Sequence, residues 1–200
     1  MNPKRIALAA TAIVLIAAPH SIGGGLKPSD TYAYATYWEK RDDVTVLLDS
    51  LTASFRADEA FIPIPVAIGF QAYGKEYTFT RESFFLIDHS GTLYGAASYE
   101  EVVEGYPPLL YDRRFSRGPV TAQEFVLSRR EPSDFYPPKG NGRRIDRVHL
   151  SPYSWFRDVI YFPRPKSGLE GVLTLRVSGG GIDPPIDIRF KVPLPGVPIR

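Results

Sequence analysis

The chain of 200 residues contains no cysteine, and this excludes several kinds of chemistry. Without thiols there is no disulfide, no thiolate nucleophile or soft metal ligand, and no cysteine that could carry a lipid. Histidine is also scarce, with three residues, and the sequence has no G-x-S-x-G elbow. No set of nucleophile, base and orienting group can be assembled from what remains. We therefore expect no catalytic residues, no metal and no cofactor.

Net charge is small as well. The 24 Lys and Arg residues nearly balance the 22 Asp and Glu residues, which gives a formal charge of +2. No strong field of one sign indicates nucleic acid as a partner. Gly and Pro together make 17 + 19 = 36 residues, a share below the ~25% at which low complexity becomes the better interpretation. With 44% hydrophobic residues, the composition is that of one ordinary globular domain.

The N-terminal segment has the order of a secretory signal. Lys4 and Arg5 precede an unbroken apolar run over 6–18, and small, turn-forming residues follow. As a helix this run spans roughly 20 Å, which is short for the roughly 30 Å hydrocarbon core of a bilayer. We predict a signal peptide over 1–23, with an uncleaved anchor as the alternative. The expected location is the periplasm or cell envelope, or secretion, with no stable membrane span after cleavage.

Residues 24–42 indicate a linker and an N-terminal arm, and the tyrosine-rich end of this stretch could equally form an edge strand. From residue 43 onward, short β-branched and aromatic runs alternate with turn residues, as in strands. The clearest run is 62–70, where five apolar residues hold period two. Pro63 and Pro65 lack the N–H that a ladder needs, so this strand should start at an edge and pair fully only from Val66.

Other strands follow from the same pattern. They are expected at 44–48 with a continuation over 51–55, and at 77–80, 84–88, 92–96, 147–150, 159–162, 172–178 and 186–192. The segment SPYSWFRD is expected as a connection, and GGGIDPP as a hairpin loop. About eight strands without long intervening helices predict an all-β fold, an antiparallel immunoglobulin-like β-sandwich over 43–195.

The middle of the sequence differs from the rest. Two capping boxes, at 98–101 and 121–124, predict two short helices. Residues 105–147 otherwise form a long crossover, with one strand signal over 109–111. A connection of this length in a compact domain is usually functional or poorly ordered.

The succession VLLDSLTASF, PVAIGFQAYGKEYTFTRESFFLIDHSGTLYGAASYEEV, DVIYFPRP and LTLRV resembles exported bacterial immunoglobulin-like domains of largely unknown function. The resemblance covers roughly 43–98 and 145–193. It implies a β-sandwich that serves as a binding or accessory module, and it brings no catalytic residues. The chain departs from such domains in lacking the lipid-attachment cysteine and in carrying the long crossover.

Several motifs carry a chemical and a structural interpretation, and we favour the structural one. Asp88 and His89 could hold a cation, but Asp and Gly together are ordinary turn residues. His149 should be a solvated strand position. The glutamates at 100, 101 and 104 indicate a solvated helix face, and 179–181 indicates a hairpin loop rather than a phosphate cradle because no helix follows.

Charge is unevenly distributed along the sequence. Residues 26–104 carry 6 basic and 13 acidic groups, whereas 105–147 carry 9 and 5, and 148–200 carry 7 and 4. Arginine pairs beside aromatic residues in the crossover have the composition of binding surfaces. The alternative is that these arginines pair internally with acidic residues. A second candidate is an aromatic platform, although Trp155 could instead plug the core. The candidate binding surface is Arg113, Arg114, Arg129, Arg130, Arg143, Arg144, Tyr111, Phe115, Tyr153 and Trp155.

From these observations we expect a non-enzymatic exported binding or accessory module with a protein or glycan partner in the cell envelope. A carbohydrate-binding domain that uses the aromatic platform is the alternative. A hydrolase that uses carboxylates from the middle segment is the third class, and it would need two acidic side chains about 5 to 10 Å apart in a cleft.

Overall fold

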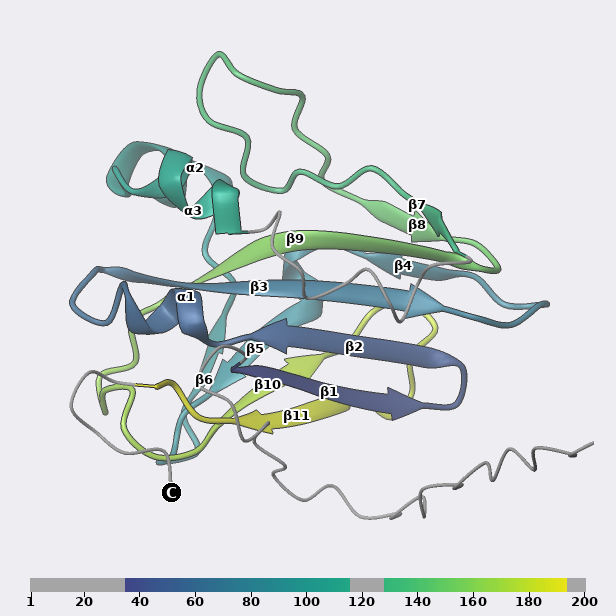
Figure 1. Cartoon of the computed structure of the whole chain (residues 1–200), viewed down its shortest axis with the longest axis horizontal. Coiled ribbons are helices and arrows are strands. Elements are labelled where there is room, and N and C mark those ends of the chain that lie inside the picture. The colour runs from purple at the N-terminus through teal and green to yellow at the C-terminus, as the bar shows by residue number, and fades with distance from the viewer. Residues whose placement is uncertain (1–34, 116–127, 194–200) are drawn as a thin grey trace, which may run out of the picture.

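The computed structural model describes residues 35–115 and 128–193, and strands dominate it (Figure 1). A five-stranded sheet has the order β1-β2-β3-β9-β7, a four-stranded sheet has the order β11-β10-β5-β6, and β4 pairs with β8. The all-β class predicted from the sequence is confirmed. The described residues contain eleven strands, more than the eight or so that the sequence predicts. The expected signal peptide lies outside the described residues.

The strands of the first sheet are β1 (Thr36–Arg41), β2 (Val44–Asp49), β3 (Phe61–Phe70), β9 (Ser154–Pro163) and β7 (Arg129–Arg130). Those of the second are β11 (Ile186–Phe190), β10 (Leu173–Val177), β5 (Phe84–Ile87) and β6 (Leu93–Gly95), and the small sheet consists of β4 (Tyr77–Phe79) and β8 (Val148–Leu150). The sequence predicts purely antiparallel sheets. The first sheet differs from this prediction, because the short β7 runs parallel to β9.

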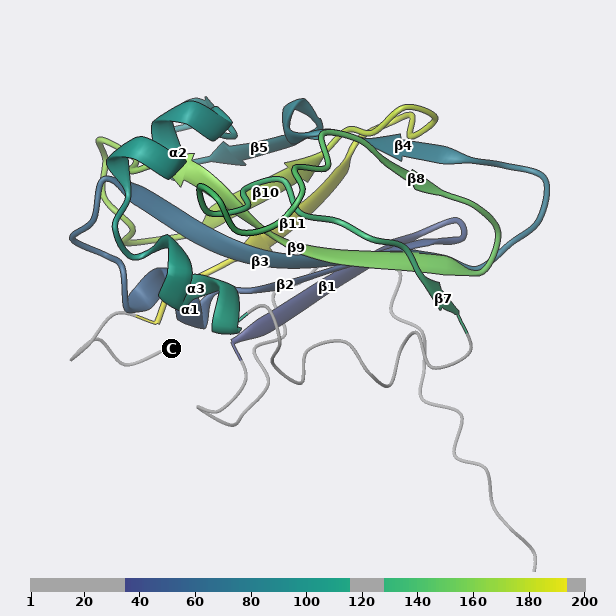
Figure 2. The ribbon, with the colours of Figure 1, turned by 90° about the horizontal axis from the view of Figure 1, so that it is seen from above.

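Side chains from both larger sheets form one apolar core. Ile64 and Ile68 of β3 lie in this core with Leu175 of β10, all without exposed surface. Period two in the sequence therefore puts one face of each strand inside. Complete burial of each such side chain contributes about 1.5–3 kcal/mol. In Figure 2 the four-stranded sheet and α2 lie on one side of β3 and β9, and α1 and α3 lie on the other.

The two prolines of β3 fit because the strand has different partners along its length. Pairing with β2 begins at Val66, as the sequence predicts, whereas pairing with β9 runs from Phe61 to Phe70. Pro63 and Pro65 therefore stand where no β2 residue needs an N–H donor. The expectation of an edge is correct for the β2 side only.

The N-terminal stretch that could be an arm or an edge strand is an edge strand. β1 pairs with β2 over its whole length, and the hydroxyl of Tyr37 donates a hydrogen bond to the carbonyl of Lys191, 3.2 Å away. This bond connects β1 to the chain that follows β11. The first described strand is thus fixed to both sheets.

The helices are α1 (Leu51–Ser54), α2 (Tyr99–Gly105) and α3 (Leu109–Phe115), with one 3-10 turn at Arg81–Ser83. The predicted α2 begins at Ser98, which accepts the N–H of Glu101 while the Glu101 carboxylate accepts the N–H of Ser98. The strand expected over 109–111 is wrong, because α3 covers it, and the strand expected over 51–55 is wrong, because α1 covers most of it. The helix predicted at 121–124 lies outside the described residues.

α3 is held by a buried carboxylate rather than by its own sequence. Asp112 accepts hydrogen bonds from the Tyr106 hydroxyl at 2.5 Å and from Nε of Arg56 at 2.9 Å, and it has no exposed surface. Burial raises the pKa of Asp112 against the lowering effect of these two donors. The cluster connects α3 to Arg56, two residues after the end of α1, so a tertiary contact decides that this segment is helical.

The GGGIDPP loop forms a hairpin as predicted, because β10 and β11 pair antiparallel on either side of it. The reason for glycine is close packing. A Cβ at Gly179 would lie 2.7 Å from the ring of Phe79, and the backbone of Gly180 exchanges two hydrogen bonds with Thr78. The loop therefore packs directly on β4. No helix among the described residues is long and apolar enough to cross a membrane.

Candidate functional site

One part of the crossover, the segment 129–136, packs along β9. β7 pairs only with Ser154 and Trp155 at the start of β9. The chain then follows the free edge of the strand, where the Glu131 N–H donates to the carbonyl of Trp155 at 2.7 Å and the Ser133 hydroxyl donates to the carbonyl of Arg157. The segment 129–136 thereby covers an edge that would otherwise be open.

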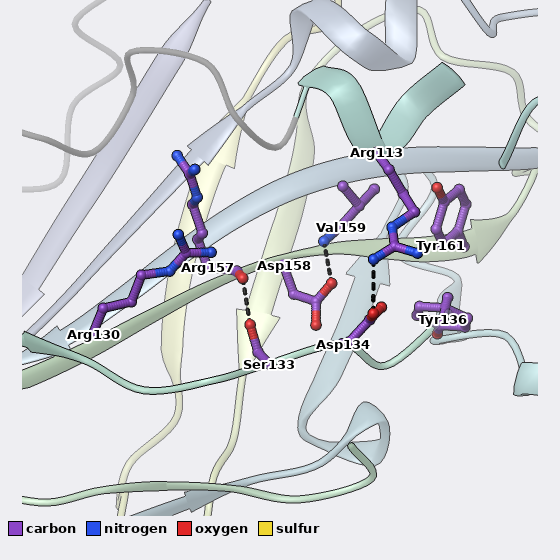
Figure 3. A pocket seen from close by; sticks show the side chains of 9 residues that line it. All are labelled: Arg113, Arg130, Ser133, Asp134, Tyr136, Arg157, Asp158, Val159 and Tyr161. Carbon is purple, nitrogen blue, oxygen red and sulfur yellow. Dashed lines mark hydrogen bonds and ion pairs between the residues drawn. The ribbon is translucent and has the colours of Figure 1, made fainter. Parts of the chain in front are cut away.

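A pocket of about 330 Å³ lies where this segment, β9 and α3 meet. Its lining comes from three parts of the chain and consists of Arg113, Arg130, Ser133, Asp134, Tyr136, Arg157, Asp158, Val159 and Tyr161. In Figure 3, Arg130 and Arg157 lie at one end of the group and Tyr136 and Tyr161 at the other, with the two aspartates between them.

The two carboxyl groups of the pocket have different partners. Asp134 forms an ion pair with Arg113, whose Nη2 lies 2.7 Å from Oδ2. Asp158 accepts two backbone hydrogen bonds, one from the N–H of Phe135 at 2.9 Å and one from the N–H of Val159, the next residue in the chain, at 2.8 Å. Burial raises the pKa of Asp158 to about 7, against these two donors, although part of its surface lines the pocket. Burial also raises the pKa of Asp134, and Arg113 limits that rise.

The tyrosines form an aromatic wall. The ring of Tyr161 lies edge-on to Tyr106 and Tyr136, with ring centres 5.3 and 5.0 Å away. The Tyr136 hydroxyl donates to the carbonyl of Ala97 at 2.8 Å. The Tyr161 hydroxyl is buried, and it is the one buried polar side-chain atom in 35–115 and 128–193 without a hydrogen-bond partner. Burial raises the pKa of Tyr161 well above its ordinary value, so the group stays a neutral hydroxyl.

Only part of the predicted arginine surface meets at this pocket. Arg113 and Arg130 line it. Arg129 pairs with Glu131 at 2.6 Å, and Arg144 pairs with Glu100 and Asp146 on another part of the fold. Three of the six predicted arginines, Arg113, Arg129 and Arg144, therefore form ion pairs within the protein. Glu100 is the one acidic partner in these pairs that lies outside the crossover.

The remaining predicted residues of this surface either do not line the pocket or have side chains outside the described residues. Arg143 is exposed, and the side chains of Arg114 and Phe115 lie outside the described residues. Tyr111 on α3 is 61% exposed and does not line the pocket. The members of the predicted surface whose side chains the structure describes therefore do not form one continuous patch.

The expected aromatic platform is also divided. Trp155 is not in a loop, because β9 begins at Ser154, five residues earlier than predicted. It packs on Leu47 and Ala67, and the guanidinium of Arg130 lies 5.6 Å from the centre of its ring. Tyr153 instead pairs with the exposed Tyr73, with ring centres 4.9 Å apart.

The other chemical motifs are structural. Asp88 accepts hydrogen bonds from the backbone of Ser90 and Thr92 and from three hydroxyls, including those of Tyr94 and Ser167 at 3.1 and 2.5 Å. These donors lower the pKa of Asp88, and they confirm the turn interpretation. His149 is exposed on β8, as expected. Within the parts of the chain that the structure describes, no three His, Asp or Glu residues are grouped to hold a metal.

The predicted binding surface lacks six of the pocket residues that carry polar groups, and the sequence gives a visible signal for one of them. Asp158 alternates with Phe156 and Ile160 on the face of β9 that packs into the core. An acid at a position that period two assigns to the interior indicates a special environment. The others have no pattern that distinguishes them: Ser133, Asp134, Tyr136, Arg157 and Tyr161.

Two carboxyl groups in one pocket meet part of what the hydrolase hypothesis requires, with Asp134 from the middle segment. Both groups, however, are engaged by donors of the protein: Asp134 by Arg113, and Asp158 by two backbone N–H groups. Comparison of the chain with protein-family models, with curated proteins and with solved structures gives no match.

Proposed function

We propose that the chain is a non-enzymatic binding module of the cell envelope, built on an immunoglobulin-like β-sandwich, and that it binds an anionic group in the pocket beside β9. The signal-like N-terminus over 1–23 supports export. The two larger sheets, which share one core, support the sandwich.

One observation carries the proposal: three arginines from three different elements line a single pocket. Arg113 comes from α3, Arg130 from β7 and Arg157 from β9. The same pocket holds Asp134, which is paired with Arg113, and Asp158, which is only partly ionised near pH 7 because its pKa is about 7. The lining therefore has an excess of positive charge. Arginine in such a setting favours carboxylate, sulfate or phosphate groups.

The test is calorimetric titration of the full chain with oligomers of galacturonate, heparin and polyphosphate, and with neutral dextran. Arg130→Ala removes one charge from the pocket. Arg143→Ala is the matched control, because it removes the same charge from another exposed arginine outside the pocket. We expect at least one polyanion to bind, with affinity at least tenfold weaker in Arg130→Ala and within twofold of wild type in Arg143→Ala.

Equal losses in the two variants would show general attraction to charge and contradict a pocket. Absence of binding by every polyanion would contradict the proposal altogether. Cleavage of any oligomer, abolished in Asp158→Asn, would contradict the non-enzymatic part. Trp38→Phe leaves Trp155 as the single tryptophan, and its emission should change on binding because Arg130 lies on its ring.

A carbohydrate-binding surface outside the pocket is the second candidate, and the Tyr73–Tyr153 pair favours it. The two side chains are exposed, by 79% and 40%, at adjacent loops. Exposed aromatic rings of this kind stack on neutral sugars. Loss of dextran binding in Tyr73→Ala, with binding retained in Tyr111→Ala, would support it. Equal binding in both variants would exclude it.

A further inference from the structure

Two exposed tyrosine rings, separate from the pocket, are in contact at one end of the fold. Tyr73 lies in the loop between β3 and β4, and Tyr153 lies in the loop between β8 and β9, which Figure 1 and Figure 2 show at the same end. The ring centres are 4.9 Å apart at an angle of 64°, so ring carbons are in van der Waals contact. The residues are 79% and 40% exposed, so solvent reaches both.

Exposure distinguishes this pair from the other tyrosine pairs of the described residues. Tyr161 contacts Tyr106 and Tyr136 at similar ring distances, but these three residues are at most 3% exposed. A reagent in solvent cannot reach buried rings. Exposed side chains also change rotamer within picoseconds to nanoseconds, so Tyr73 and Tyr153 can turn their ring edges toward each other.

The backbone holds Tyr153 at this place at a cost. Its φ is 53°, in the left-handed region that glycine or asparagine adopts more easily. The carbonyl of Tyr153 accepts the N–H of Arg129 at 2.8 Å, and the Ser154 hydroxyl donates to the carbonyl of Ser151 at 2.7 Å, which fixes the turn. A half-exposed ring recovers little energy from burial. A large side chain in a strained, exposed turn indicates a role for the ring itself.

We propose that Tyr73 and Tyr153 form a site of oxidative cross-linking, at which a haem peroxidase with hydrogen peroxide joins the two rings. Loss of one electron and the phenolic proton from each side chain gives two tyrosyl radicals. These couple through a carbon–carbon bond between the ring carbons next to the hydroxyl-bearing carbons. Each coupled carbon then gives up its hydrogen as the hydroxyl re-forms. The two protons and two electrons removed overall reduce one hydrogen peroxide to two molecules of water.

Such a bond is a covalent link that a chain without cysteine can still form. It joins two loops that are far apart in sequence, so it closes a long loop and restricts the unfolded chain as a disulfide does. Its formation in the organism rests on the export part of the proposed function, because peroxide chemistry outside the cytoplasm must supply the oxidant. The reactivity of the pair itself can be measured on the purified chain.

The experiment treats the full chain with a haem peroxidase and hydrogen peroxide and then digests it with trypsin. The tryptic peptides 57–75 and 148–157 contain one tyrosine each, Tyr73 and Tyr153. We expect these peptides to be joined, with a mass two hydrogen atoms below their sum, in a yield independent of protein concentration and at least tenfold above that of any other tyrosine pair. Tyr73→Phe and Tyr153→Phe should abolish the product. Tyr111→Phe is the matched control, because it removes another exposed tyrosine, and it should leave the yield within twofold.

Thermal unfolding measures the consequence of the bond. The cross-linked chain should melt roughly 5 °C or more above the untreated chain, and treated Tyr73→Phe should show no such rise. Joined peptides found only in dimers, or in a yield no higher than that of other tyrosine pairs, would overturn the site. An unchanged melting temperature would overturn the stabilising role. Failure of every polyanion to bind would count against the proposed function and leave this result standing.

Discussion

Replacement of Asp158 by Asn should raise the stability of the protein, relative to wild type, by more at pH 8 than at pH 4. The carboxylate stands on the core-facing side of β9, and burial raises its pKa from 3.8 to about 7. A group whose pKa is higher in the folded state than in the unfolded state destabilises the fold as it ionises. The penalty is absent below about pH 4, grows between pH 4 and pH 7, and is complete above about pH 8.

The size of the effect follows from the shift. A change of about 3 pKa units at 1.36 kcal/mol per unit gives on the order of 4 kcal/mol between pH 4 and pH 8. Asn and protonated Asp have nearly the same shape, but the N–H groups of Phe135 and Val159 donate to different oxygens of Asp158, Oδ2 and Oδ1, so the single amide oxygen of Asn keeps one of these hydrogen bonds and loses the other. The cost of the lost hydrogen bond is the same at every pH, so the change of the stability difference between pH 4 and pH 8, and not its value at pH 4, measures the penalty of ionisation.

Urea unfolding of both proteins at pH 4, 5.5, 7 and 8 measures this difference, since other carboxylates titrate equally in both and cancel. The free energy of unfolding of Asp158→Asn, minus that of wild type, should rise with pH and level off near pH 8. A difference that falls with pH would refute the reasoning, because it would mean that Arg113 and the backbone donors stabilise the anion more than burial destabilises it. Binding of an anion should likewise be tighter at pH 6 than at pH 8.

Three further changes test the fold. Gly179→Ala should lower the free energy of unfolding by about 1–3 kcal/mol in urea titrations, because its Cβ would overlap the buried ring of Phe79; unchanged stability would mean that the loop can move away. Ser98→Ala removes the N-cap of α2 and should cost about 1 kcal/mol, with Glu104→Ala as a control on the same helix. Asp88→Asn should lower the melting temperature at pH 7, and this deficit should shrink on acidification below about pH 4, because the donors around Asp88 lower its pKa and favour the carboxylate; a deficit independent of pH would contradict this explanation.

Local patterns predicted the elements whose stability is decided locally or by one buried face. The alternation over 62–70 predicts β3, and the Ser98 capping box predicts α2, because the groups that stabilise these elements are neighbours in sequence. α3 could not be predicted in this way. Asp112 of this helix accepts a hydrogen bond from Arg56, which lies 56 residues earlier in the chain. This tertiary contact overrides the strand signal over 109–111.

The pocket could not be predicted from the sequence for a related reason. Its charged residues come from three parts of the chain, and only the folded topology brings these parts together. Arg113 meets Asp134 because the crossover turns back along the free edge of β9, and no spacing in the sequence encodes that return. Asp158 differs, because an acid between Phe156 and Ile160 contradicts the apolar face of its own strand. A predicted strand that begins at Ser154 includes this conflict between an acidic residue and an apolar face. An acidic residue at a core-facing position has an energetic cost, and such a position indicates a functional role.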